Sequence, residues 1–461
     1  MIFNPVFSMI DPASKVGCIA VLGAGRSGKG AAALALRLAE RVVILDGAAP
    51  EKLSKAAADF RGMGAEPVFG PEAIAFADPV DYAVQSPGID PRQPIVRQFT
   101  DRGIPVIGEI EFASRHFRAP VIAITGTNGK TTTTEMVGAV LRHAGLRAEC
   151  AGNYGVPFSE IVLSEEPQDA VALEVSSFQL ELLEQFRPRV AVWLNFAPDH
   201  MDRYETIEEY RDAKMRIFEN LGPEELIVIQ SPIASFADAS PARKVTFSAF
   251  GAGDYTYSDG WILRGGERIF DFSATRLRGV HNAENVMAVL AIAQELGISA
   301  STVAEALKAY VAPAHRCELV GEIDGHEFIN DSKATNLHAL ESSLRGQLEP
   351  VILIAGGKDK GLDFTEIRDA LSGKVSHAVL IGETRERIAQ DWQGVVDCSL
   401  AGSLSEAVEE ALRRARPKQA ILLSPGTSSF DMFTSYEDRG DSFRREVQRL
   451  QSSCGAGREI V

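Results

Sequence analysis

The sequence predicts an α/β protein made of several domains, each with its own parallel sheet. Short apolar runs, nearly all of which lead into Gly, Ser, Asn or Asp, alternate with amphipathic segments along the chain, as is typical of buried parallel strands with helices between them. The 461 residues exceed what one core can organise, and 45% apolar content suffices for about two to four cores. The predicted strands are CIAVLGAG (18–25), RVVILD (41–46), YAVQSPG (82–88), VIAITG (121–126), AVALEVSS (170–177), VAVWLNF (190–196), LIVIQ (226–230), VILIAGG (351–357), HAVLIG (377–382) and AILLSPG (420–426).

Two boundaries divide this pattern into three predicted domains. The first lies near Gly108, before the basic segment ASRHFRAP, and the second lies near Pro313, after segments of helical periodicity at 282–297 and 301–310. Because ligands of open α/β sheets bind at the carboxyl ends of the strands, we expect the sites in the loops where the apolar runs end. The expected domains are 1–108, 109–312 and 313–461.

Charge and cysteine content limit the partners and the compartment. The formal net charge of −16 argues against nucleic acid or an anionic membrane as the main partner, since both are held by clustered Lys and Arg. The five cysteines are too scattered for a disulfide framework or a thiolate metal site. The first residues lack a basic segment followed by a long apolar stretch, and no window approaches the length of a membrane span. We therefore expect a soluble cytoplasmic protein that is not inserted in a membrane.

The first glycine-rich loop, GAGRSGKG (23–30), follows the strand at 18–22 and leads into an Ala- and Leu-rich segment at 31–39. It fits the Rossmann-type turn, and Asp46 ends the next strand about 20 residues on, where an acid can accept ribose hydroxyls. It also fits the P-loop spacing, but Gly30 stands where a Ser or Thr would carry Mg²⁺. The loop alone leaves a dinucleotide and another nucleotide as alternatives.

A second glycine-rich loop follows the strand at 121–126. There GTNGKTT (126–132) directly precedes a segment of helical periodicity. Backbone N–H groups of such a turn face an anion, Lys130 can reach the β- and γ-phosphates, and a hydroxyl of Thr131 or Thr132 can ligate Mg²⁺. The full P-loop pattern would place Gly where this chain has Ile124. The segment still predicts a nucleoside triphosphate site, and two nucleotide loops favour an ATP-driven step on a nucleotide-like substrate.

The remaining candidate site residues are two possible metal ligands and one unusual lysine. Glu174 ends a strand and is a candidate Mg²⁺ ligand, whereas His200 is either a second ligand or a hydrogen-bonded loop histidine. The segment 206–221 is helical by periodicity, and Lys214 lies in the middle of its apolar face. This lysine either extends its ammonium to a domain edge or is a buried amine with a lowered pKa, reactive or modified.

Together these segments resemble the Mur ligases, the ATP-dependent amide-forming enzymes of peptidoglycan synthesis. The resemblance covers essentially the whole chain. It rests on GAGRSGKG and QSPGI in the first domain, on TGTNGKTTT, GNYGVPF, LEVSSFQLE, NFAPDHMDRY and HNAENVMA in the second, and on HRCELV, NDSKATN, GGKDKGLDF and LLSPGTSSFDMFTSYEDRGDSF in the third.

The resemblance implies a role for each matching position. The implied ATP-binding residues are Gly126, Thr127, Asn128, Gly129, Lys130, Thr131, Thr132, Asn282, Asn285, Arg316 and Asp331. The implied UDP-sugar residues are Ser27, Asp46, Ser86, Gly88, Asn153, Gln179 and His200. The implied D-glutamate residues are Lys333, Thr335, Lys360, Ser429 and Tyr436. The implied metal ligands are Thr131, Glu174, His200 and Lys214 as a carbamate, and the implied catalytic residues are Lys130, His200, Lys214 and Lys333. Tyr436 stands where Phe is common, and Asp359 is an alternative to Lys360.

The implied activity is ATP-dependent addition of D-glutamate to UDP-N-acetylmuramoyl-L-alanine through an acyl phosphate. A Rossmann-like UDP-binding domain, a central ATP-binding domain and a Rossmann-like amino-acid-binding domain are implied, with ATP, two Mg²⁺ ions and a monomeric protein. The nearest alternative is a ligase of the group with another acceptor amino acid, or a folylpolyglutamate synthetase. A nicotinamide-linked oxidoreductase could use Gly23, Gly25, Gly28 and Asp46 but would leave Lys130 unexplained, and a regulatory module would hydrolyse ATP without ligation.

Overall fold

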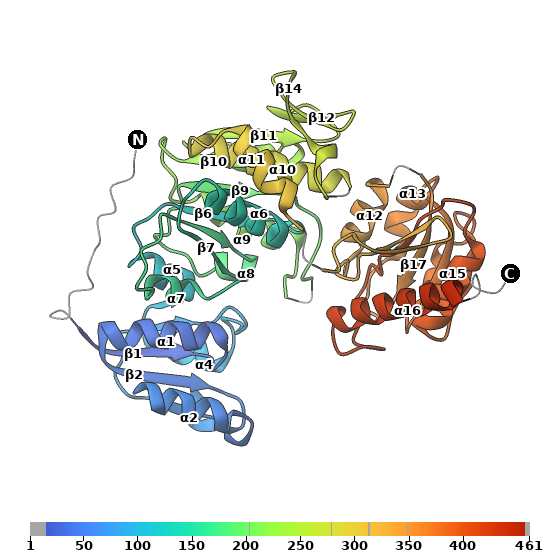
Figure 1. Cartoon of the computed structure of the whole chain (residues 1–461). Coiled ribbons are helices and arrows are strands. Elements are labelled where there is room, and N and C mark those ends of the chain that lie inside the picture. The colour runs from blue at the N-terminus through green and yellow to red at the C-terminus, as the bar shows by residue number, and fades with distance from the viewer. Residues whose placement is uncertain (1–14, 202, 278, 312–313, 348, 457–461) are drawn as a thin grey trace. The chain divides into compact units, whose positions relative to one another are not determined.

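The computed structural model describes residues 15–201, 203–277, 279–311, 314–347 and 349–456 (Figure 1). Its strands form three sheets, and the chain divides into two compact units, one with the residues up to Asp271 and Asn285–Lys308, the other with Phe272–Glu284 and the residues from Ala309 onward. The predicted α/β class with several sheets is confirmed. The expected boundary between 312 and 313 lies outside the described residues, and the domain limits stay a prediction.

The first sheet has five parallel strands in the order β3-β2-β1-β4-β5. Alternate residues of β1 face opposite cores, because Ile19 and Val21 pack with α1 whereas Ala20 and Leu22 pack with α4. The strands are β1 (Val16–Leu22), β2 (Ala39–Asp46), β3 (Glu66–Phe69), β4 (Tyr82–Gln85) and β5 (Val106–Gly108). The helices are α1 (Arg26–Leu38), α2 (Ser54–Met63), α3 (Pro71–Ile74), α4 (Pro94–Thr100) and α5 (Glu109–Ser114).

The second sheet has nine strands in the order β14-β13-β12-β11-β10-β9-β6-β8-β7, and only its β12–β14 end is antiparallel. The strands are β6 (Val121–Thr125), β7 (Ala148–Gly152), β8 (Ala170–Glu174), β9 (Val190–Trp193), β10 (Leu226–Gln230), β11 (Arg243–Ser248), β12 (Tyr255–Ser258), β13 (Trp261–Arg264) and β14 (Glu267–Asp271). The helices that follow in the chain are α6 (Lys130–His143), α7 (Phe158–Val162), α8 (Ser177–Leu180), α9 (Ile207–Met215), α10 (Val280–Glu295) and α11 (Ala300–Ala309).

The third sheet has six strands in the order β15-β16-β20-β17-β18-β19, and only the β15–β16 pair is antiparallel. Helices α15 and α16 pack together on one face (Figure 1), and α12, α13 and α14 cover the other. The strands are β15 (Glu318–Ile323), β16 (His326–Asn330), β17 (Val351–Gly356), β18 (Val375–Ile381), β19 (Cys398–Leu400) and β20 (Ile421–Leu423). The helices are α12 (Leu337–Arg345), α13 (Arg368–Leu371), α14 (Arg385–Asp391), α15 (Leu404–Arg414) and α16 (Tyr436–Ala456).

All ten predicted strands are present, and the predicted helix at 206–221 is shorter than expected. It is α-helical as α9 only to Met215 and continues as a 3-10 turn over Arg216–Phe218. Within the part of the chain that the structure describes, no helix combines the length and the apolar character needed to span a bilayer.

Candidate functional site

The loop between β6 and α6 has the geometry of an anion site. Gly129 lies at the N-terminus of α6 with φ +83°, a conformation that favours glycine, and a Cβ built there would lie 2.5 Å from the side-chain oxygen of Asn285. No side chain caps this helix end, and the N–H groups of Lys130, Thr131 and Thr132 begin the first turn, where helical partners are lacking. The helix dipole and these N–H groups together favour a bound anion.

Two lysine amines converge on one carbonyl of this loop. The Lys130 Nζ donates to the carbonyls of Gly126 and Thr127, each at 2.8 Å. The Lys214 Nζ, which reaches the loop from α9, donates to the same Gly126 carbonyl at 3.0 Å and to the Thr125 Oγ1 at 3.3 Å. The structure therefore brings together the two lysines that the sequence singled out.

Lys214 is a buried amine and does not extend to a domain edge. The residue is 1% exposed, and its Nζ lies 4.8 Å from the ring centroid of Tyr210. Burial lowers the pKa of this amine well below its ordinary value, the charge of Lys130 lowers it further, and Asp199 and Glu174 oppose the shift. A buried amine of lowered pKa is a nucleophile that can be modified.

Glu174 offers an unsatisfied oxygen at the end of β8. Its carboxylate is buried, the Asn153 Nδ2 donates to Oε1 at 2.7 Å, and Oε2 has no hydrogen-bond partner. A buried carboxylate oxygen without a partner fits a cation, and Mg²⁺ takes oxygen ligands. Among the described residues no three His, Cys, Asp or Glu side chains group closely enough to hold a metal ion.

His200 lies on the loop after β9, which also carries Asp199. Its φ is +58°, its side chain is 44% exposed, and its ring centroid lies 4.9 Å from that of Phe178. The neighbouring helix α8 begins with a capping box in which the Gln179 Oε1 accepts from the N–H and the hydroxyl of Ser176. Gln179 therefore fixes the start of α8, the helix that contains Phe178.

The first glycine-rich loop is closely packed around Asp46 and Ser86. A Cβ at Gly28 would lie 1.9 Å from the Gly23 carbonyl, so the loop requires glycine there. Both carboxylate oxygens of Asp46 accept from backbone N–H groups, those of Ala24 at 2.8 Å and Ala48 at 2.9 Å. The buried Ser86 Oγ has no hydrogen-bond partner. Asp46 thus holds the loop in place, and an unsatisfied hydroxyl lies beside it.

Two further predicted residues, Ser27 and Gly88, lie in this loop and in the segment after β4. Ser27 lies half-buried in the first turn of α1. A Cβ at Gly88 would meet no heavy atom within 4 Å, so protein packing does not require glycine at that position. Space beside an unsatisfied hydroxyl is consistent with a ligand.

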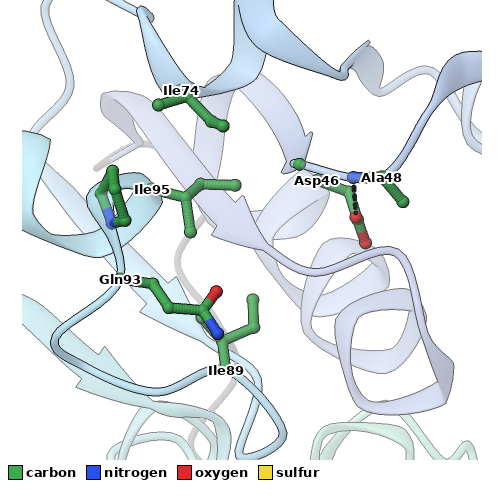
Figure 2. A pocket seen from close by; sticks show the side chains of 8 residues that line it. Asp46, Ala48, Ile74, Ile89, Gln93 and Ile95 are labelled. Atoms are coloured by element: carbon green, nitrogen blue, oxygen red, sulfur yellow. Dashed lines mark hydrogen bonds between the residues drawn. The ribbon is translucent and has the colours of Figure 1, made fainter.

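A pocket of about 290 Å³ opens next to Asp46 (Figure 2). Figure 2 shows Asp46 and Ala48 on one side, with Ile74 and Ile95 opposite them. Such a space, with apolar walls and a few polar groups, suits a flat ring with polar edges. Its lining residues are Asp46, Gly47, Ala48, Ile74, Ile89, Gln93, Pro94 and Ile95. Of these the sequence predicted only Asp46, because single isoleucines in loops and short helices carry no motif.

In the third sheet, Asp331 follows β16 at the centre of a polar network. Ser343 and Ser424 donate their hydroxyls to its Oδ2, and the Cys317 N–H donates to its Oδ1 at 3.2 Å. Burial raises the pKa of Asp331 to about 6, and these hydrogen bonds and the charge of Arg316 oppose the shift. Asp331 therefore fixes the chain next to Arg316, which is half-buried.

Four of the predicted D-glutamate residues pair with one another. The Lys333 Nζ lies 3.7 Å from the ring centroid of Tyr436, and the Lys360 Nζ donates to the Thr335 carbonyl at 3.4 Å. Asp359 instead accepts from the Arg387 guanidinium, its nearest contact being 3.1 Å. Lys360, and not Asp359, therefore points to the other predicted residues. The fifth, Ser429, is buried in the loop after β20.

The sequence did not single out several residues that hold these loops. The Asn195 carboxamide bonds the backbone of Asn128, and the Tyr210 hydroxyl lies 3.4 Å from the Thr127 Oγ1. Arg439 is buried and donates to the carbonyls of Ser332 and Thr427. Their partners lie far away in sequence, so no spacing rule reveals them. Asn282 and Asn285, on α10, are both buried.

Two domain families match the chain. Residues 124–293 match the Mur ligase middle domain, and residues 315–426 match the Mur ligase, glutamate ligase domain. The UDP-N-acetylmuramoylalanine–D-glutamate ligase of Syntrophotalea carbinolica is 39% identical over 443 residues, which cover 94% of this chain and 98% of that protein. The ligase of the same name from Salinibacter ruber is 39% identical over 450 residues, covering 93% and 97%. The solved MurF ligase from Thermotoga maritima in complex with ADP has a similar fold, with a TM-score of 0.57 at 14% identity over 96% of this chain and 98% of that one.

Proposed function

The chain belongs to the Mur ligase family, and on that premise we propose that it is a UDP-N-acetylmuramoylalanine–D-glutamate ligase. It joins D-glutamate to UDP-N-acetylmuramoyl-L-alanine in an ATP-dependent step of peptidoglycan precursor synthesis. The observation that carries the proposal is 39% identity over 94% of the chain with a relative of that name. The two lysine amines at the β6–α6 loop support it chemically.

The triphosphate of ATP lies on residues 126–132 in this proposal. The amides of the first turn of α6 bind its anionic oxygens, and Lys130 leaves the carbonyls of Gly126 and Thr127 to bind the γ-phosphate. Asn282 and Asn285 bind the adenine, and Arg316 reaches the nucleotide with its chain fixed by Asp331.

The UDP-sugar lies at the first glycine-rich loop. The uracil ring occupies the pocket beside Asp46, whose carboxylate orders the loop N–H groups. Ser27, Ser86 and Gly88 line the path of the diphosphate, and the free Ser86 hydroxyl donates to it. Asn153, Gln179 and His200 bind the substrate further along.

The reaction proceeds in two steps. The L-alanine carboxylate attacks the γ-phosphorus in line, which breaks the bond to ADP and forms an acyl phosphate. The amine of D-glutamate then attacks the acyl carbon, phosphate leaves, and the amine loses a proton as the amide forms. Two anions meet in the first step, so Lys130 and the positive end of α6 lower its barrier by neutralising charge.

In the proposed enzyme, Mg²⁺ would be held by Glu174, Thr131, His200 and Lys214 as a carbamate. Bound Mg²⁺ supplies charge neutralisation at the phosphate oxygens. Glu174 presents its unpartnered Oε2 to the cation. The neutral Lys214 amine could add carbon dioxide and release a proton to solvent, which would give a carbamate whose anionic oxygens could ligate Mg²⁺. A carbamate also removes the repulsion between two amines at one carbonyl.

D-glutamate binds to the third sheet. Lys333, Thr335, Lys360, Ser429 and Tyr436 lie on loops at the carboxyl ends of its strands or directly after them, and the two lysines supply the positive charge that its carboxylates require. The protein acts as a cytoplasmic monomer in this proposal.

The decisive experiment is ATP-dependent phosphate release with UDP-N-acetylmuramoyl-L-alanine while the amino acid is varied. We expect release with D-glutamate and little with L-glutamate or without an amino acid. Equal rates with both enantiomers would exclude the acceptor assignment. Release that does not depend on any amino acid would indicate an ATPase that does not ligate.

A further inference from the structure

The segment after β9 is tied to the triphosphate loop by an asparagine that has no part in the reaction above. The Asn195 Oδ1 accepts from the Asn128 N–H at 2.8 Å, and the Asn195 Nδ2 donates to the Asn128 carbonyl at 3.1 Å. One carboxamide therefore satisfies both backbone groups of a residue 67 positions earlier in the chain. The Asn195 carbonyl also accepts from the Thr127 N–H at 3.1 Å.

Ala197 strengthens the same connection. Its N–H donates to the Thr127 Oγ1 at 3.1 Å, and that hydroxyl donates to the Ala197 carbonyl at 3.1 Å. Five hydrogen bonds thus join residues 195 and 197 to residues 127 and 128. We call residues 195–197 with residues 127–128 the loop clamp.

The loop clamp determines which backbone N–H groups of the loop are available to bind phosphate. The Asn128 N–H is directed to Asn195, so it is withdrawn from the anion site and the amides at the start of α6 carry the binding. Asn128 precedes Gly129, whose left-handed conformation turns the chain into the helix. A shift of Asn128 would therefore change the direction of every following amide.

We propose that Asn195 is a positioning residue that fixes the triphosphate loop in its binding conformation. The inference rests on the proposed function, since it assumes that this loop holds ATP. Asn195 lies four residues before Asp199, so the loop clamp also sets the distance between the triphosphate loop and the segment that carries His200. Asn195 acts through the backbone of Asn128 and need not touch ATP.

The test is the Asn195→Ala variant of the full chain, with ATP binding measured by calorimetry and steady-state kinetics measured for both nucleotide substrates. We expect the Kd and KM for ATP to rise about tenfold or more, since two hydrogen bonds to the loop are lost. The KM for the UDP-sugar should change less than about twofold, because the loop and the pocket around Asp46, which hold its uridine and diphosphate, lie on the first sheet. A general loss of structure would alter both values together.

Asn220→Ala is the matched control. The Asn220 Nδ2 also donates to two backbone carbonyls, those of Glu184 at 3.0 Å and Phe186 at 3.2 Å, and the residue is likewise half-buried. It should bind ATP like the wild type. If Asn195→Ala does not fold, Asn195→Asp tests the same residue, because it keeps an acceptor for the Asn128 N–H and loses the donor to the Asn128 carbonyl.

The outcomes separate the two proposals. A folded Asn195→Ala protein with the wild-type Kd for ATP overturns the positioning role, as does a wild-type Kd in Asn195→Asp when the first variant does not fold. Wild-type protein that binds no ATP overturns the proposed function itself. Weaker ATP binding in the variant with an unchanged UDP-sugar site supports the loop clamp.

Discussion

Replacing the buried lysine of α9 by methionine should separate its chemical role from its structural one. Lys214 is 1% exposed, and methionine has a similar length and volume, so Lys214→Met leaves no large cavity. The hydrogen bond to the Gly126 carbonyl is lost, but that carbonyl still accepts from Lys130 at 2.8 Å. The substitution therefore leaves the buried Gly126 carbonyl with a hydrogen-bond partner.

The expected change in the free energy of unfolding is therefore small. Losing the hydrogen bonds to the Gly126 carbonyl and the Thr125 hydroxyl costs about 1–2 kcal/mol, and removing a buried amine regains about 1–3 kcal/mol of desolvation. We expect Lys214→Met to be as stable as the wild type within about 1 kcal/mol, or more stable. Activity, by contrast, should fall at least about a hundredfold, the usual effect of removing a group that stabilises transition-state charge.

Phosphate release and thermal unfolding of the same preparations provide the assay. Lys244→Met is the control, because Lys244 pairs with Asp238 at the surface of the same compact unit. Lys214→Ala leaves space for a small anion, and short-chain carboxylic acids should restore part of its activity. Full activity in Lys214→Met would refute the role of this lysine, and a collapse of its melting temperature would refute the packing argument.

The pH dependence of stability provides a second test of Lys214→Met. The pKa of Lys214 is lowered in the folded protein, so the stability that its neutral form contributes is present above the ordinary lysine pKa and is lost as pH falls through the folded pKa. The wild type should therefore lose stability relative to Lys214→Met as the solution becomes more acidic. A difference between the two proteins that stays constant with pH would mean that the amine is not held neutral.

Three further predictions concern one ligand site each. Lys130→Ala should lower turnover at least about a thousandfold and leave the calorimetric Kd for the UDP-sugar within about twofold, and wild-type turnover would exclude the ATP site. Asp46→Asn replaces a carboxylate that accepts from two loop N–H groups by a weaker acceptor, and it should weaken UDP-sugar binding about tenfold. Asp59→Asn, at the surface, is the control and should bind the UDP-sugar like the wild type. Equal Kd values for the UDP-sugar in the two variants would contradict this prediction. Ser343→Ala removes a hydroxyl that donates to the Asp331 carboxylate. Because the pKa of Asp331 is raised to about 6, its protonated form contributes stability that is fully present below the unfolded carboxyl pKa and is lost as pH rises through the folded pKa. That variant should therefore lose stability chiefly above about pH 6, and thermal unfolding that differs equally at all pH values would argue against it.

The sequence predicted the central strands and the buried lysine for one physical reason. Strands that are covered on both faces must be apolar throughout, so runs such as 121–126 and 351–357 are visible without a structure. Lys214 was visible because the charges of its helix lie on the opposite face, and of the two alternatives left open for its amine the structure shows the buried one. The strands at the β12–β14 end of the second sheet were missed, since segments such as YTYS in β12 contain polar residues and are not apolar throughout.

The partners of the site residues could not be predicted in the same way, because they depend on the order of strands in the sheet. Periodicity shows that Lys214 is buried but not that its amine shares the Gly126 carbonyl with Lys130. It also gives no indication of Asn195, whose carboxamide recognises a backbone and not a side chain. A residue that binds backbone atoms can have any neighbours in sequence, so no motif marks it.

Strand order also explains why the separate motifs meet at common places. In each sheet, one central strand lies between two parallel strands that both come later in the chain. Strand β1 lies between β2 and β4, β6 between β8 and β9, and β17 between β18 and β20. At such a switch point the loops after neighbouring strands leave in opposite directions and open a crevice. The pocket beside Asp46 lies between the loops after β2 and β4, and the Lys130 loop follows β6 with Glu174 and Asn195 at the ends of its neighbours. In the proposed enzyme, strand order would therefore set where the phosphate groups bind, and the glycines, lysines and carboxylates of each loop would determine which ligand binds there.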